Sequence, residues 1–160
     1  MLTPRLTNLV IFVGCCALIL IGLYMQHVMG LQPCALCITQ RIFIIAVGFT
    51  ALIACLHNPT YSGRRVYAVL GGLLAIIGGA FSSRQLWLQS LPEDQVPACG
   101  PPLEYILEAF PLREALSILL RGDGNCADIV WTFLGISIPG WTLVAFTGLL
   151  GFNLWQLLRR

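Results

Sequence analysis

Four apolar runs dominate the chain, and short polar stretches separate them. The runs are Leu9–Met25, Ile42–Leu56, Val66–Phe81 and Trp141–Leu158. A bilayer core needs about 20 mainly apolar residues, with a range of about 17–25. The first and last runs are long enough to cross a bilayer. The middle two become long enough when neighbouring polar residues that a membrane helix tolerates are included. The pattern predicts membrane helices over residues 9–29, 40–57, 66–86 and 140–158.

The composition agrees with a small integral membrane protein. The chain has 160 residues, of which 58% are hydrophobic and 10% are charged, whereas soluble domains average about 45–50% apolar and about 25% charged residues. No stretch long enough for a soluble domain remains outside the four runs. We therefore expect one integral membrane domain, residues 1–160, with an all-α fold: a four-transmembrane-helix bundle with outer loops over residues 30–39 and 87–139.

The charged residues are distributed unevenly around these spans. All seven acidic residues lie between Glu93 and Asp128, and there is no lysine. The segments on the opposite side carry Arg5, Arg64, Arg65, Arg159 and Arg160. Short loops rich in basic residues stay in the cytoplasm, so both termini are expected there and the two outer loops outside. Four arginines oppose this bias: Arg41, Arg84, Arg113 and Arg121. The sequence contains no basic patch with aromatic partners of the kind that would indicate nucleic acid binding.

A cleavable signal peptide is an alternative interpretation of the first run, because Arg5 precedes it. The run is longer than the usual apolar segment of about 7–15 residues. The bulky sequence Tyr24-Met25-Gln26-His27 follows it, where small residues would mark a cleavage site. We therefore expect the first run to be a membrane span.

The seven cysteines fall into two groups. Three lie in the predicted spans, where cysteine often packs as a small apolar residue: Cys15, Cys16 and Cys55. The other four lie in the outer loops: Cys34, Cys37, Cys99 and Cys126. An even number on the oxidising side of a membrane fits disulfides. The simplest pairing joins Cys34 to Cys37 and Cys99 to Cys126, but the sequence alone does not separate the three possible pairings.

Cys34 and Cys37 form a C-x-x-C pair at the start of the second span, and we interpret the pair as redox-active. A disulfide between Cys34 and Cys37 would close a very small ring, which restricts few unfolded conformations and contributes little stability. Pro33 suits the beginning of a helix, and the positive end of a helix favours thiolates. Arg41 follows Cys37 by four residues on the same helical face, where it can stabilise a thiolate or an anionic ligand. The alternative is that Arg41 only extends to the lipid headgroups.

The long outer loop, Gln89–Pro139, carries Cys99 and Cys126 in turn-rich sequence. About ten residues join the third span to Cys99, a reach of about 30 Å when extended, so Cys99 can approach either a soluble protein or the C-x-x-C pair. A structural disulfide is the alternative. The apolar periodicity of Leu103–Leu120 predicts one or two short amphipathic helices on the outer leaflet, or an ordinary packed helix.

Two segments resemble the DsbB family of bacterial inner-membrane disulfide bond formation proteins. One includes Gln26-His27-Val28-Met29 and continues through Pro33-Cys34-Ala35-Leu36-Cys37 to Arg41. The other includes Gly124-Asn125-Cys126-Ala127 and ends at Pro139-Gly140-Trp141. The similarity extends over the whole topology. The chain departs from the family pattern at Gln40, which replaces an acidic residue, and at Ser90, near which the family has a histidine at the quinone site.

The resemblance implies a quinone-dependent protein-disulfide oxidoreductase of the bacterial inner membrane, with its cysteines in the periplasm. Its partner would be a periplasmic thioredoxin-fold thiol oxidase of the DsbA type, and its cofactor would be ubiquinone or menaquinone dissolved in the membrane lipid. The catalytic residues would be Cys34, Cys37, Cys99 and Cys126. The partner would attack Cys99, and Cys34 would form the disulfide between the loops. Cys37 would pass electrons to the quinone through a charge-transfer or adduct state, with Arg41 stabilising the negative charge.

Three alternatives to this function are left by the sequence. The four outer cysteines could hold zinc, but a second short cysteine pair is missing, so we expect no metal. The protein could be a membrane adaptor whose disulfides only hold its loops. A quinone enzyme similar to vitamin K epoxide reductase is the nearest enzymatic alternative, and the two matching segments favour the DsbB family over it.

Overall fold

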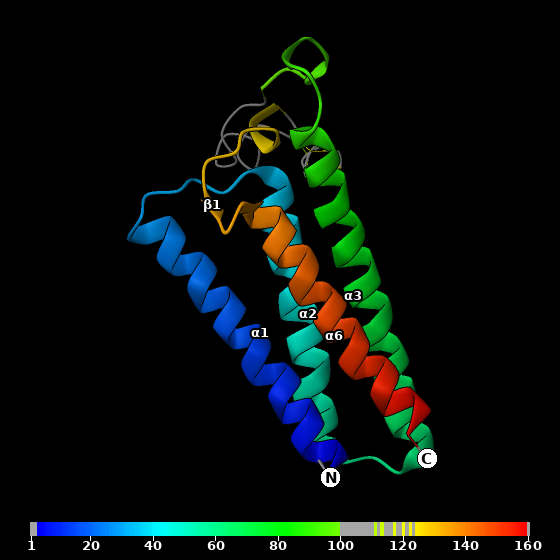
Figure 1. Cartoon of the computed structure of the whole chain (residues 1–160). Helices are drawn as coiled ribbons and strands as arrows, with labels where there is room; N and C mark the ends of the chain where they lie inside the picture. Colours follow the sequence, from blue (N-terminus) through cyan, green and yellow to red (C-terminus); the bar gives the residue numbers. More distant parts are fainter. Residues whose placement is uncertain are drawn as a thin grey trace.

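The computed structural model describes residues 3–99, 111, 113, 117, 120, 122 and 124–159. Within these residues, four long helices form a bundle (Figure 1): α1 (Pro4–His27), α2 (Ala35–His57), α3 (Tyr61–Gln89) and α6 (Ile138–Leu158). Four short elements lie between α3 and α6: η1 (Glu93–Gln95), η2 (Gly124–Cys126), β1 (Thr132–Phe133) and β2 (Ile136–Ser137). The predicted all-α, four-helix membrane bundle is therefore confirmed.

Each of the four helices is long and apolar enough to cross a membrane. The shortest, α6, has 21 residues, and at about 1.5 Å per residue it extends about 31 Å, close to the thickness of a bilayer core. All four begin before the apolar runs that predicted them, because helical hydrogen bonding continues into more polar sequence. For α2 this early start places Cys37 inside the helix.

Polar and turn residues set the helix boundaries. The side-chain oxygen of Thr3 accepts a hydrogen bond from the N–H of Leu6 (3.3 Å) at the start of α1, which satisfies one of the unpaired N–H groups at a helix N-terminus. Asn58 ends α2 with a left-handed backbone (φ 43°). Only residues 58–60 separate α2 from α3, so these two helices are antiparallel neighbours.

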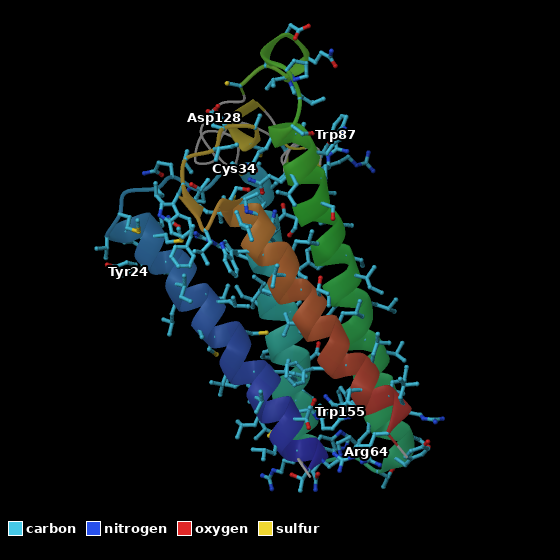
Figure 2. All side chains as sticks on the ribbon, in the orientation of Figure 1. Tyr24, Cys34, Arg64, Trp87, Asp128 and Trp155 are labelled. Carbon is cyan, nitrogen blue, oxygen red and sulfur yellow. The ribbon has the colours of Figure 1, made fainter. Side chains whose placement is uncertain are left out.

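The two ends of the bundle carry different chemistry. Arg64 and Trp155 lie at the end that holds the chain termini, and Cys34 and Asp128 lie at the opposite end (Figure 2). At the first end, the guanidinium of Arg159 lies 5.2 Å from the centre of the Trp155 ring, a contact that suits a membrane–water interface. This arrangement agrees with the predicted separation of basic segments from cysteine-bearing loops.

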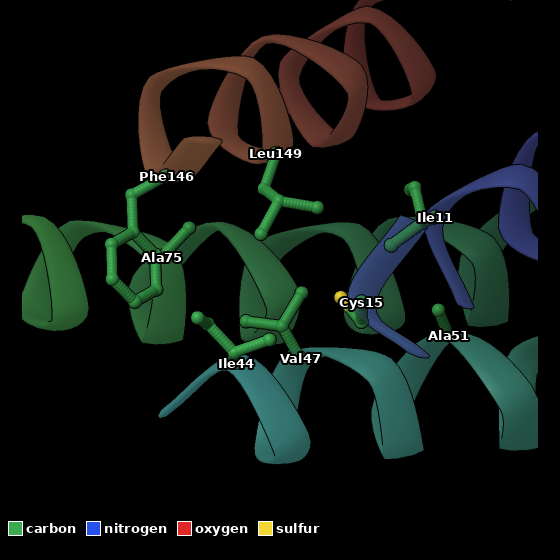
Figure 3. Close-up of a cluster of buried hydrophobic side chains, with 8 residues drawn as sticks. All are labelled: Ile11, Cys15, Ile44, Val47, Ala51, Ala75, Phe146 and Leu149. Atoms are coloured by element: carbon green, nitrogen blue, oxygen red, sulfur yellow. The ribbon is translucent and has the colours of Figure 1, made fainter. Parts of the chain in front are cut away.

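The inner core draws side chains from all four helices (Figure 3): Ile11, Cys15, Ile44, Val47, Ala51, Ala75, Phe146 and Leu149. Small residues allow close approach between the helices, since a Cβ added at Gly48 would lie 2.9 Å from the Cβ of Cys15. Close van der Waals packing of this kind drives helix association in lipid. Packing is closest between α3 and α6, while α1 touches α6 only lightly.

The loop between α3 and α6 returns to the outer end of the bundle. Its η2 turn rests on α2 and α3, where Cys126 joins a second buried cluster with Ala35, Leu36 and Leu88. The β1–β2 hairpin follows and leads directly into α6. The amphipathic helix predicted over Leu103–Leu120 lies outside the described residues, apart from isolated positions.

Replacing Gly78 by alanine is expected to destabilise the α3–α6 pair. An added Cβ would lie 2.3 Å from the ring of the buried Phe146, and overpacking of this kind costs about 1–3 kcal/mol. The thermal unfolding midpoint of the purified protein in detergent measures the effect. Gly148→Ala on α6 is the matched control, because nothing lies within 4 Å of its added Cβ. Equal midpoints for the two variants would contradict the packing described here.

Candidate functional site

The C-x-x-C pair lies where α2 begins. Cys34 is the N-cap residue, with extended backbone (ψ 171°), and Cys37 lies in the first turn. The N–H of Ile38 donates to the carbonyl of Cys34 (3.2 Å) and fixes this turn. The two Sγ atoms are 3.0 Å apart, so a small side-chain movement is enough to form a disulfide of about 2.05 Å.

Cys126 reaches the same site from the distant loop. Cys126 is the last residue of the η2 turn, and its side chain is fully buried (0% exposed). A hydrogen bond with the Cys126 side chain, a second with Cys37, and burial together raise the pKa of Cys34 above its ordinary value. A raised pKa means that Cys34 stays a thiol at neutral pH. The Cys34 side chain therefore contacts two other cysteines and is itself a weak nucleophile in the reduced protein.

Cys99 lies at the exposed edge of this region. Its segment is held to the η2 turn by a hydrogen bond from the N–H of Gly124 to the carbonyl of Ala98 (3.2 Å). A Cβ at Gly124 would lie 2.4 Å from the carbonyl oxygen of Pro97, so glycine is needed for this approach. The backbone next to Cys99 thus contacts the backbone two residues before Cys126. The four outer cysteines gather at one end of the bundle.

Two buried glutamines connect α2 and α3 below the sulfurs: Gln40 and Gln85, which are 2% and 3% exposed. The Nε2 of Gln40 donates to the Oε1 of Gln85 (2.8 Å). The Nε2 of Gln85 lies 3.3 Å from the Sγ of Cys34 and 3.4 Å from the Sγ of Cys37. Gln85 was not predicted from the sequence as a site residue. The signal available was a polar residue inside an apolar membrane helix, which commonly marks a functional position.

Arg41 binds α1 rather than only extending to the lipid headgroups. Its Nη1 donates to the Oε1 of Gln26, and its Nη2 donates to the carbonyl of Gly22 (2.9 Å). A Cβ at Gly22 would lie 3.3 Å from the Nε of Arg41, so the missing side chain leaves room for the guanidinium. Arg41 and Cys37 line the same cavity, as their spacing along the helix predicts. Gln26 is a second contact residue whose role the sequence did not reveal.

A large apolar cavity lies beside Cys37, between α1, α2, α6 and the β1–β2 hairpin. Its volume is about 620 Å³, within the range of about 300–1,000 Å³ that is typical of small-molecule sites. The light contact between α1 and α6 leaves this space. One wall is aromatic: Trp131, Phe133 and Trp141. The ring centres of successive pairs are 6.0 Å apart, and the indole N–H of Trp141 donates to the carbonyl of Phe133 (3.1 Å).

Three of the side chains that line the cavity come from about one turn of α2 and form its polar corner: Cys37, Gln40 and Arg41. A planar apolar ring with a carbonyl oxygen fits such a lining, because the walls favour the ring and the guanidinium favours the oxygen. Over the part of the chain that the structure describes, no group of three or more His, Cys, Asp or Glu side chains could hold a metal ion.

Comparison with known proteins gives consistent matches over nearly the whole chain. The family model for disulfide bond formation protein DsbB matches residues 4–156. A disulfide bond formation protein B from Saccharophagus degradans is 62% identical over 156 residues, which cover 98% of this chain and 94% of that protein. Similar proteins come from Stutzerimonas stutzeri, 50% identical over 99% of this chain and 97% of its own, and from Hahella chejuensis, 54% identical over 92% and 89%.

Alkylation of the reduced protein is expected to separate the outer cysteines by environment. At neutral pH, iodoacetamide should modify the exposed Cys99 at least about tenfold faster than Cys34, whose raised pKa and burial limit its thiolate fraction. Mass spectrometry of peptides after short exposures measures the two rates. In denaturant the rates should converge. Equal rates in the folded protein would show that Cys34 does not have the environment described.

Proposed function

The chain belongs to the DsbB family of quinone-dependent thiol oxidases, and we propose that it works through two cysteine pairs, Cys99 with Cys126 and Cys34 with Cys37. It is a multi-pass protein of the bacterial inner membrane. It reoxidises a periplasmic DsbA-type dithiol oxidase and passes the electrons to a membrane quinone, ubiquinone or menaquinone. In our proposal, residues 1–160 form one integral domain with cytoplasmic termini and periplasmic cysteines.

The observation that carries the residue assignment is that Cys34 contacts both Cys37 and Cys126. Thiol–disulfide exchange needs an attacking sulfur in line with a disulfide. Cys126 approaches Cys34 from the loop side, and Cys37 lies on the cavity side. This geometry supports a route in which electrons enter from the loop and leave toward the cavity.

The first exchange would take place at the exposed loop. A thiolate of the reduced partner attacks the Sγ of Cys99 in the Cys99–Cys126 disulfide; that bond breaks, and Cys126 leaves as a thiolate. The partner's second thiolate then attacks the mixed disulfide and releases Cys99. The partner is now a disulfide, and Cys99 and Cys126 hold its two electrons. The exposure of Cys99 and the burial of Cys126 support this order of attack.

The second exchange would transfer the electron pair to α2. The thiolate of Cys126 attacks the Sγ of Cys34, the Cys34–Cys37 bond breaks, and Cys37 leaves as a thiolate. Cys99 then attacks Cys126, which restores the first disulfide and releases Cys34. The C-x-x-C dithiol now holds the two electrons, and its disulfide returns when two electrons and two protons pass to the quinone. A DsbA-type partner is a strong oxidant, at about −120 mV, so the quinone must provide the driving force.

The cavity beside Cys37 fits a quinone head group. Its volume accommodates a ring, its aromatic wall favours a planar ring, and its polar corner contains a thiol and a guanidinium. When bound there, a quinone supplies a two-electron acceptor. Arg41, held by Gln26 and Gly22, would stabilise negative charge on a ring oxygen, and Cys37 would donate the electrons. The cavity lies between α1 and α6, two helices long and apolar enough to cross a membrane, and this supports entry of a lipid-soluble molecule.

Serine substitutions should separate the two halves of the reaction. Cys37→Ser is expected to abolish quinone reduction, because no thiolate remains beside the cavity. Cys99→Ser is expected to abolish oxidation of the partner while the Cys34–Cys37 pair still reacts with a small dithiol and a soluble quinone. Anaerobic stopped-flow absorbance, with reduced DsbA-type partner and each quinone in turn, measures both reactions. Normal turnover by Cys37→Ser would overturn the assignment.

Replacing Arg41 by alanine should weaken the use of quinone. Loss of a charged hydrogen-bond donor costs about 1.5–3 kcal/mol, which corresponds to an increase of about 10–100-fold in the apparent KM for quinone. Oxidation of Cys99 and Cys126 by an added disulfide should be unaffected. Arg84→Ala is the matched control, since Arg84 is an exposed arginine of α3 that does not line the cavity. An unchanged KM for Arg41→Ala would show that Arg41 only connects α1 to α2 and does not bind the quinone.

A further inference from the structure

We propose that Gln85 is a further catalytic residue, whose amide N–H groups stabilise the Cys37 thiolate as the Cys34–Cys37 disulfide opens, and that Gln40 positions it. The proposal rests on the redox role given above to the C-x-x-C pair. It concerns residues of α2 and α3 that meet only in the folded bundle. Gln85 qualifies as catalytic because its nitrogen contacts both reacting sulfurs.

One amide nitrogen, the Nε2 of Gln85, lies close to both sulfurs of the C-x-x-C pair. The Nε2 of Gln85 carries two hydrogens, and it lies 3.3 Å from the Sγ of Cys34 and 3.4 Å from the Sγ of Cys37. Both sulfurs are therefore within hydrogen-bond distance of this one nitrogen. The Oε1 of Gln85 is farther from Cys37, at 3.7 Å. The oxygen accepts from the Cys37 thiol at this longer distance, and the nitrogen is the closer group to the Cys37 sulfur.

Gln40 determines which end of the Gln85 amide faces the sulfurs. Its own Nε2 donates to the Oε1 of Gln85 at 2.8 Å, and both side chains are almost fully buried. With the Gln40 amide in this orientation, a reversed Gln85 amide would place two NH₂ groups face to face and its oxygen toward the sulfurs. Burial makes such a mismatch costly. The pair of glutamines is therefore expected to hold the donor end toward Cys34 and Cys37.

This orientation matters at one step of the exchange. When the thiolate of Cys126 attacks the Sγ of Cys34, a new Cys126–Cys34 bond forms and the electron pair of the Cys34–Cys37 bond passes to the sulfur of Cys37. The negative charge that develops there appears in a buried place, where hydrogen-bond donors have the greatest effect. Gln85 can supply such a donor without moving. A thiolate stabilised in this way leaves more readily and makes the disulfide easier to reduce.

The Cys34–Cys37 equilibrium with glutathione tests the proposal directly. The full chain carrying Cys99→Ser and Cys126→Ser isolates the pair, and the protein is purified in detergent and depleted of quinone. Gln85→Leu and Gln85→Met should each lower the equilibrium constant for reduction about tenfold, which is about 30 mV for a two-electron couple. They should also slow alkylation of Cys37 at neutral pH. Gln40→Leu should cause a smaller change in the same direction, because it removes the positioning contact but keeps the donor.

Gln89→Leu is the matched control, since Gln89 is a glutamine one turn further along α3 whose Oε1 accepts from Ser137 (2.8 Å) and not from a cysteine. It should leave the equilibrium within twofold of the unmutated pair. A Gln85→Met protein that also stays within twofold, or a Gln89→Leu protein that shifts as far as Gln85→Leu, would overturn the role of Gln85. An unchanged equilibrium in Gln40→Leu would overturn the positioning role.

The measurement involves neither the partner nor a quinone, so it separates this proposal from the proposed function. Failure of the unmutated chain to oxidise a reduced DsbA-type partner would refute the function. The effect of Gln85 on the Cys34–Cys37 equilibrium would still be measured. Conversely, normal turnover by the unmutated chain together with an unshifted equilibrium in Gln85→Met would refute only the role of Gln85.

Discussion

The contact of the Cys126 turn with the outer ends of α2 and α3 is the interaction on which the site depends. Leu36 and Leu88 are 0% and 2% exposed beneath this turn, and their burial fixes a cysteine that is 89 residues from Cys37 in the sequence. The turn between α2 and α3 at the opposite end is three residues long, so the two helices stay paired along their length. Without that paired platform, the loop would have no fixed position from which to reach Cys34.

The bundle combines one closely packed helix pair, α3 and α6, with one loosely packed pair, α1 and α6, and the mechanism that we propose uses both. Small residues let α3 and α6 approach closely, as at Gly78 against the ring of Phe146. By contrast, α1 contacts α6 only lightly, and the cavity occupies the space between them. Arg41 connects α1 to α2 through Gln26 and Gly22. The residue that we assign to the quinone therefore also holds the wall of the quinone cavity in place.

The sequence predicted the features that depend on local pattern. Apolar runs long enough for a bilayer predicted the four helices, and the C-x-x-C pair was placed correctly at a helix start because its spacing and Pro33 are local signals. Arg41 was found because a spacing of four residues on a helix is also local. Gln85 was not found, and Gln26 was noticed only through the family resemblance, since their contacts cross from α3 to α2 and from α1 to α2. No periodicity in one segment shows which face a second helix will present to it.

The site residues also differ in charge, and this difference explains why some of them were harder to predict from the sequence than others. Arg41 is half-buried at the edge of the cavity, where a permanent charge keeps part of its hydration. Beneath the sulfurs the groups are neutral amides, and over the described residues no buried side-chain nitrogen or oxygen lacks a hydrogen-bond partner. A permanent cation in place of Gln85 would lose hydration in every redox state, a cost of several kcal/mol, yet it would be needed only while Cys37 is a thiolate. An amide can donate a hydrogen bond to the Cys37 thiolate without carrying a charge, and its oxygen accepts a hydrogen bond from Gln40. The buried part of the site is therefore built from uncharged residues, and a search of the sequence for charges and cysteines does not identify Gln85.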